Sequence, residues 1–140
     1  MNVIKKLFVV VAALIGFGIC ANAQTVTITR QMYGNAGSAI VEFKPTNLSQ
    51  EVYINPTTPL TEGYYTGVVS WMSTKNRPGI LIYSDNLSRS RGIFIHYGQY
   101  DDLWSKGCVV LEINGFTQMY DYLKEKLGMN GTFTIHVKYR

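Results

Sequence analysis

The chain has 140 residues, 46% of them hydrophobic and 16% charged, with a formal net charge of +4. A chain of this length folds as one domain with a hydrophobic core that needs no disulfide or metal to hold it together. Its lysines and arginines form no cluster along one segment, so nucleic acid is not expected as a partner.

The first 23 residues predict a secretory signal peptide. Two lysines precede an apolar run over 7–19, and the segment Ala21-Asn22-Ala23 supplies the small residues that come before a signal-peptidase cut. The apolar run is too short and wrongly flanked to span a membrane. We therefore expect a single domain over 24–140, exported to the periplasm or secreted, with no membrane span once the leader is removed.

Cys20 raises the alternative of a lipoprotein, because it follows the apolar run. Ile19 stands where lipid processing needs a small residue, so simple cleavage is favoured. Loss of the leader removes two lysines, which lowers the charge from +4 to +2, and leaves Cys108 as the only thiol of the mature chain. Exported domains usually pair their cysteines. Cys108 is therefore a buried inert residue, an intermolecular bridge or a reactive thiol.

Strands dominate the predicted domain. Thr alternates with Val and Ile over 25–29, which predicts a strand with one buried face, and a turn at 34–37 follows. Apolar and β-branched runs bounded by turn residues predict the further strands, over 38–43, 52–54, 63–71, 79–83, 92–96, 108–113 and 132–139. These patterns predict a mainly β domain in which most strands are antiparallel.

One helix is predicted before the last strand. Apolar side chains recur every three or four residues over 116–127, with Asn114 as the predicted N-cap and Gly128 as the stop. Lysines fall in its last turns, where the helix dipole favours them. The predicted fold class is therefore mainly β, with one helix in the C-terminal half packed on the sheet.

The segment I-H-Y-G-Q-Y-D-D-L-W-S-K-G-C, over 95–108, carries the candidate chemistry. If the strands on either side of it pair, His96 closes one strand while Cys108 opens the next at the same end of the sheet. A thiolate is a nucleophile, and a nearby imidazole activates the thiol and carries its proton. The alternative is a structural histidine and a cysteine that acts as a small buried hydrophobe.

The same segment supplies further candidate site residues. Gly107 would let the backbone approach a substrate closely, and the N–H groups of Lys106, Gly107 and Cys108 could face a developing oxyanion. Ser105 could bind substrate or brace the loop. The candidate residues for binding substrate within the segment are Tyr97, Gly98, Tyr100 and Trp104. Histidine, cysteine and carboxylate residues show no close ligand spacing, so neither a metal nor a cofactor is expected.

The motifs G-I-F-I-H-Y-G, over 92–98, and S-K-G-C-V-V-L, over 105–111, resemble the active-site signature of L,D-transpeptidase catalytic domains. The chain is more similar still to a family of small bacterial and phage domains of uncharacterised function, which carry I-H-x-G, a short polar loop and G-C-I. The segment T-E-G-Y-Y, over 61–65, also resembles a P-x-G-x-Y segment common to both groups. The resemblance covers roughly 60–137.

This resemblance implies a β-rich transpeptidase-like fold and a peptidoglycan stem peptide as substrate. Cys108 would attack a stem-peptide amide, His96 would be the base, and Ser105 and Gly107 would shape the oxyanion region. Lys106 stands where transpeptidases commonly have a second histidine, and Val110 where they usually have arginine. Lys106 or Arg91 would then recognise the substrate carboxylate.

A second hypothesis keeps the scaffold without the chemistry. In it, the exported domain binds cell-wall fragments or a protein partner, and Cys108 is inert. The sequence indicates no oligomeric state and does not indicate which group orients His96.

Overall fold

A computed structural model describes residues 24–32, 37–98 and 107–140 of the chain. The predicted leader over 1–23 and most of the predicted turn at 34–37 lie outside these residues. The strands are β1 (Thr25–Arg30), β2 (Ser38–Phe43), β3 (Leu48–Tyr53), β4 (Gly63–Met72), β5 (Arg77–Tyr83), β6 (Phe94–Tyr97), β7 (Val109–Leu111) and β8 (Thr132–Tyr139). The helices are α2 (Ile113–Leu127) and two short 3-10 helices, η1 (Lys44–Thr46) and η2 (Arg89–Arg91).

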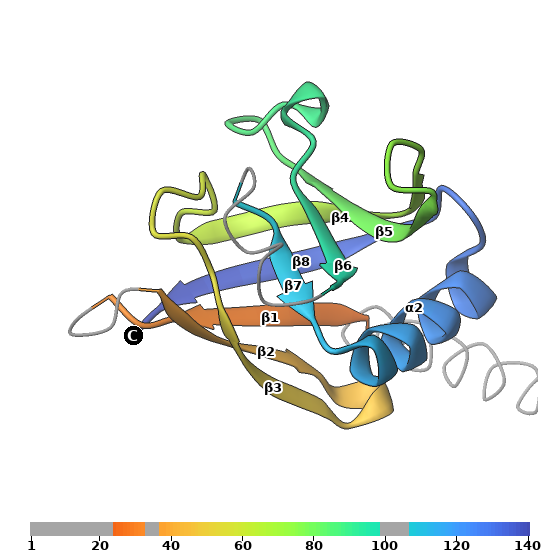
Figure 1. Cartoon of the computed structure of the whole chain (residues 1–140), viewed down its shortest axis with the longest axis horizontal. Helices are drawn as coiled ribbons and strands as arrows, with labels where there is room; N and C mark the ends of the chain where they lie inside the picture. The colour runs from red at the N-terminus through yellow and green to blue at the C-terminus, as the bar shows by residue number, and fades with distance from the viewer. Residues whose placement is uncertain (1–23, 33–36, 99–106) are drawn as a thin grey trace, which may run out of the picture.

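The eight strands form one sheet in the order β3-β2-β1-β8-β4-β5-β6-β7. The sheet curves until β3 and β7, the first and last strands in that order, lie side by side, so that it is nearly closed (Figure 1). Most neighbours are antiparallel, whereas β1–β8 and β6–β7 are parallel. The predicted mainly β class with one late helix is confirmed.

Side-chain alternation along the strands builds the core inside the curved sheet. In β1 the inward positions hold Val26, Ile28 and the buried Arg30. The outward positions hold threonines, as the T-V-T-I-T pattern predicts. Helix α2 lies at one end of the sheet and buries a stripe of side chains against this core, namely Phe116, Met119, Tyr120 and Leu123 (Figure 1). Full burial of each large apolar side chain contributes about 1.5–3 kcal/mol before entropy is counted. No helix within the described ranges is long and apolar enough to cross a membrane.

The start of α2 differs from the prediction. The N-cap residue is Glu112, with extended backbone angles of φ −62° and ψ 144°, so Asn114 lies inside the first turn instead of capping it. The reason is that β7 ends at Leu111 and leaves a single residue to turn the chain into the helix. The predicted stop is confirmed, because Gly128 has φ 80° and its N–H donates to the Lys124 carbonyl at 2.8 Å.

Strand β3 is longer than the predicted strand over 52–54. It pairs with β2 along its whole length, from Phe43 opposite Leu48 to Ser38 opposite Tyr53. The first half of this strand lacks an apolar pattern, because polar side chains such as Ser49 and Glu51 occupy its exposed positions. The sequence therefore did not predict it.

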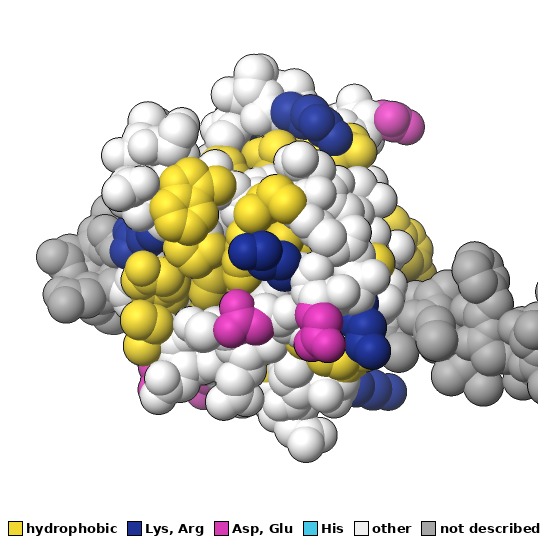
Figure 2. Space-filling view, turned by 90° about the vertical axis from the view of Figure 1, so that its right-hand side faces the viewer, with side chains coloured by type: hydrophobic (Ala, Val, Ile, Leu, Met, Phe, Trp, Pro, Cys, Tyr) yellow, Lys and Arg dark blue, Asp and Glu magenta, His cyan; other side chains and the backbone are white. Residues whose placement is uncertain are grey.

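The end of the molecule formed by α2 and the β4–β5 turn carries apolar side chains on its surface, beside Lys, Arg, Asp and Glu (Figure 2). Trp71 near the end of β4 and Met129 just after α2 are 52% and 43% exposed.

Candidate functional site

Strands β6 and β7, which carry the candidate site, are neighbours, but they run parallel. The register pairs Ile95 with Val109, His96 with Val110 and Tyr97 with Leu111. The prediction that His96 and Cys108 meet at the same end of the sheet, across a loop mouth, is wrong, because that arrangement requires an antiparallel hairpin. In the parallel pair, Cys108 instead lies level with Phe94, one position before the first pair, so His96 and Cys108 are diagonal neighbours.

Cys108 and His96 share one face of the sheet. Ile95 and Val109 belong to the core, so the alternating positions on each strand point to the other side. Paired residues of adjacent strands point to the same face, which places Cys108 with His96 and away from the core. Diagonal positions of neighbouring strands are about 7–8 Å apart at the backbone.

The sulfur of Cys108 contacts backbone groups at the start of β6 and just before it. The N–H of Phe94 donates to Sγ at 3.4 Å, and the S–H can donate to the Gly92 carbonyl at 3.8 Å. The first contact stabilises the thiolate, whereas the second stabilises the neutral thiol. Cys108 is buried, with 6% of the residue exposed.

His96 is completely buried, and its ring has a defined orientation. Nδ1 lies 2.8 Å from the carbonyl oxygen of Tyr97. A carbonyl can only accept a hydrogen bond, so Nδ1 carries the proton when this bond forms. The neutral ring then has its lone pair on Nε2, which is the tautomer that a base needs. The Tyr97 carbonyl is thus the orienting group that the sequence did not indicate.

The Gly107 carbonyl accepts a hydrogen bond from a residue that no motif in the sequence indicated. The hydroxyl of Thr58, between β3 and β4, donates to the Gly107 carbonyl at 2.5 Å. Thr58 is one of three buried polar or charged residues in the described ranges, with Arg30 and His96. A threonine in a polar turn gives no signal of this contact in the sequence.

The remaining candidates are dispersed. The Tyr97 ring lies on the core side, 5.8 Å from the Phe116 ring centroid, and so on the face opposite Cys108. The N–H of Gly98 donates to the Leu111 carbonyl at 3.3 Å and extends the β6–β7 pairing. Arg91 is exposed at the end of η2, one residue before Gly92. The other four, Tyr100, Trp104, Ser105 and Lys106, lie outside the described residues.

The described residues contain no group of three or more His, Cys, Asp or Glu side chains placed to hold a metal ion. His136 lies on β8 and stacks on the exposed ring of Tyr64, with ring centroids 4.2 Å apart.

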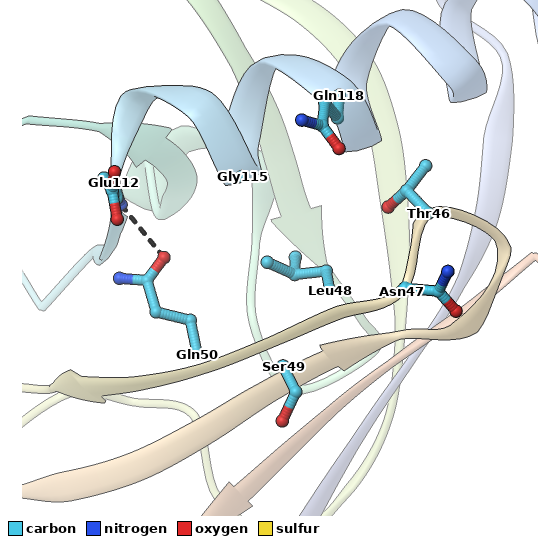
Figure 3. A pocket seen from close by; sticks show the side chains of 8 residues that line it. All are labelled: Thr46, Asn47, Leu48, Ser49, Gln50, Glu112, Gly115 and Gln118. Carbon is cyan, nitrogen blue, oxygen red and sulfur yellow. Dashed lines mark hydrogen bonds between the residues drawn. The ribbon is translucent and has the colours of Figure 1, made fainter.

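A separate polar pocket of about 210 Å³ lies where β3 meets the first turn of α2 (Figure 3). The Oε1 atom of Gln50 accepts the Glu112 N–H at 3.1 Å across it. Its lining is mostly amide and hydroxyl groups, from Thr46, Asn47, Leu48, Ser49, Gln50, Glu112, Gly115 and Gln118. It contains neither Cys108 nor His96, and its residues gave no signal in the sequence.

Comparison of the chain with protein-family models, with curated proteins and with solved structures finds no match.

Proposed function

We propose that this chain is an exported, cysteine-dependent acyltransferase or amidase of the L,D-transpeptidase type that acts on peptidoglycan stem peptides. The observation that carries the proposal is the placement of Cys108 and His96 as diagonal neighbours on one face of adjacent strands. The orientation of His96 supports it, because the bond to Tyr97 leaves Nε2 as the proton acceptor.

The proposed reaction has two steps. His96 takes the proton of the Cys108 thiol, and the thiolate attacks an amide carbonyl of the stem peptide. The tetrahedral intermediate collapses, the C–N bond breaks, and the imidazolium gives its proton to the departing terminal D-amino acid. An amine of a second stem then attacks the thioester and loses a proton to His96, and the thiolate leaves as the new amide forms. With water as the acceptor, the second step is hydrolysis.

Other parts of the proposal rest on the sequence. The leader over 1–23 supports export to the periplasm or beyond, and Ser105 and Gly107 would shape the oxyanion region beside backbone N–H groups. Arg91 or Lys106 would bind the substrate carboxylate. Arg91 is exposed and precedes Gly92, whose carbonyl contacts the Cys108 sulfur, so its chain position suits that role.

A non-catalytic binding domain is the second candidate function, and the burial of the pair favours it. His96 has no exposed surface and Cys108 has 6%. In this alternative the domain binds cell-wall fragments or a protein partner, and the thiol serves only packing.

The two candidates differ in whether a covalent intermediate forms. The purified domain is incubated with a synthetic stem peptide that ends in a D-amino acid, and its intact mass is measured over time, with Cys108→Ser as the matched control. The proposal predicts an acyl-enzyme on the wild type alone, together with release of the D-amino acid. Peptide binding that is equal in both proteins, without any acyl-enzyme, would establish the binding domain instead.

A further inference from the structure

The Gly107 carbonyl belongs to the peptide bond that joins Gly107 to Cys108. It accepts a hydrogen bond from a side chain in the segment between β3 and β4. We infer that Thr58 is a positioning residue for the nucleophile, an inference that rests on the proposed function. Its hydroxyl donates to the Gly107 carbonyl although the two residues are 49 positions apart. Thr58 is 94% buried, so this hydrogen bond forms away from competing water.

Thr58 is itself held in place by a short turn that Asn55 organises. The Thr57 N–H donates to Asn55 Oδ1 at 3.0 Å, and the Thr58 N–H donates to the Asn55 carbonyl at 2.9 Å. Side-chain acceptance by an asparagine two residues back is an Asx turn, which fixes the backbone locally. Prolines at positions 56 and 59 restrict it further. The turn therefore presents the hydroxyl from a rigid support.

The backbone angle of Gly107 and the lack of a side chain there both allow its close contact with Thr58. It has φ 78°, a region that glycine enters without steric cost. A Cβ atom at this position would lie 2.8 Å from both Cβ and Oγ1 of Thr58 and 2.9 Å from its Cα. The close approach that lets the hydrogen bond form is thus available only to glycine.

Fixing the Gly107 carbonyl also fixes the direction of the Cys108 N–H. The two groups belong to one planar trans peptide and point to opposite sides of it. The N–H of Cys108 is therefore directed away from Thr58, and the Cα–Cβ bond that carries Sγ starts from a fixed peptide plane. In acyl transfer, backbone N–H groups beside the nucleophile stabilise the oxyanion, and this stabilisation depends on their direction.

The test compares two reactions of the same thiol. Iodoacetamide alkylates a thiolate with loss of iodide and without an oxyanion, whereas p-nitrophenyl acetate acylates it through a tetrahedral oxyanion with loss of p-nitrophenolate. Thr58→Val removes only the hydroxyl function, and Thr58→Ser restores it. Thr57→Val is the control for the turn itself, because the Thr57 hydroxyl donates to Asn55 Oδ1 and does not contact Gly107. Thermal unfolding is followed for all variants.

We expect Thr58→Val to lower the acylation rate by about 10- to 100-fold relative to the alkylation rate, as misplaced catalytic groups do. Thr58→Ser is expected to recover most of that ratio, and Thr57→Val to keep it. An unchanged ratio in Thr58→Val, or equal losses in the valine and serine variants, would overturn the positioning role alone. A wild type that is alkylated but never acylated would overturn the proposed function, and the positioning role with it.

Discussion

The Nδ1 atom of His96 lies 2.8 Å from the carbonyl oxygen of Tyr97, the next residue along β6. This contact within one strand orients the imidazole. In the neutral ring this bond leaves the lone pair on Nε2, and His96 shares a face of the sheet with Cys108.

The tautomer of His96 is directly measurable. We expect the neutral ring to carry its proton on Nδ1, because only that form donates to the Tyr97 carbonyl. Two-bond ¹H–¹⁵N correlation spectra near pH 8 distinguish the ring nitrogens, and His136→Gln assigns the signals, since the chain has two histidines. A neutral His96 with its proton on Nε2 would contradict the orientation described above.

Gly107→Ala is expected to destabilise the domain by about 2–4 kcal/mol, since strain at a positive φ and a steric clash add. The clash is with Thr58, 2.8 Å from the new Cβ. Gly128→Ala separates the two effects, because Gly128 has φ 80° but nothing within 4 Å of an added Cβ. Urea unfolding should give the Gly128 variant a smaller loss, about 1–3 kcal/mol, from its backbone angles alone. Equal losses for both variants would show that the Thr58 contact is looser than described.

Tyr120 makes the stability sensitive to alkaline pH. Burial, with a smaller contribution from the Asp121 charge, raises the pKa of its phenol above the ordinary value of 10.0. The unfolded chain therefore loses this proton at a lower pH than the folded one, and stability falls as the pH rises through that range. Its hydroxyl also donates to the Ser70 carbonyl at 2.8 Å.

We expect Tyr120→Phe to cost about 0.5–1.5 kcal/mol at pH 7, the usual net value of such a hydrogen bond. The difference from the wild type should shrink above about pH 10. Urea unfolding from pH 7 to 11 measures both effects, with Tyr122→Phe on the same helix as the control. A difference that grows with pH would mean that the sign is wrong.

Gln50 joins β3 to the start of α2 by accepting the Glu112 N–H. We expect Gln50→Leu to cost about 1 kcal/mol in the free energy of unfolding, because it removes the acceptor of a helix N-terminal donor. Gln118→Leu alters the same pocket without removing that acceptor and should cost less. Amide hydrogen exchange in the first turn of α2 should accelerate only in the Gln50 variant. Acceleration in both variants would assign the effect to the pocket as a whole.

The sequence predicted the elements whose pattern is local. Alternation along 25–29 and the apolar spacing over 116–127 correspond closely to β1 and α2. Asn114 was wrong as the predicted N-cap, because the preference of asparagine for that position does not indicate where the preceding strand ends. Strand β7 ends at Leu111, so only Glu112 lies between β7 and α2. The first half of β3 was missed because its stability comes from pairing with β2, not from its own apolar residues.

The sequence indicated Cys108 and His96 as candidate residues, but it did not indicate how they lie relative to each other. The direction of β7 relative to β6 depends on how the chain returns between them, and no periodicity in 98–108 encodes it. The contact of Thr58 with Gly107 arises from packing between residues 49 positions apart, and a single sequence contains no signal of such a contact. The orienting group of His96 is a backbone carbonyl, which every residue possesses.

The measurement that tests the central claim most directly is the rate of Cys108 alkylation as a function of pH, in the wild type and in His96→Ala. An ordinary exposed cysteine titrates near pH 8.5. An activated pair predicts fast alkylation of the wild type well below that pH, and a shift of the profile to higher pH in His96→Ala. A folded protein whose thiol is unreactive, or reacts equally in both proteins, would contradict the cysteine–histidine pair and favour the binding domain.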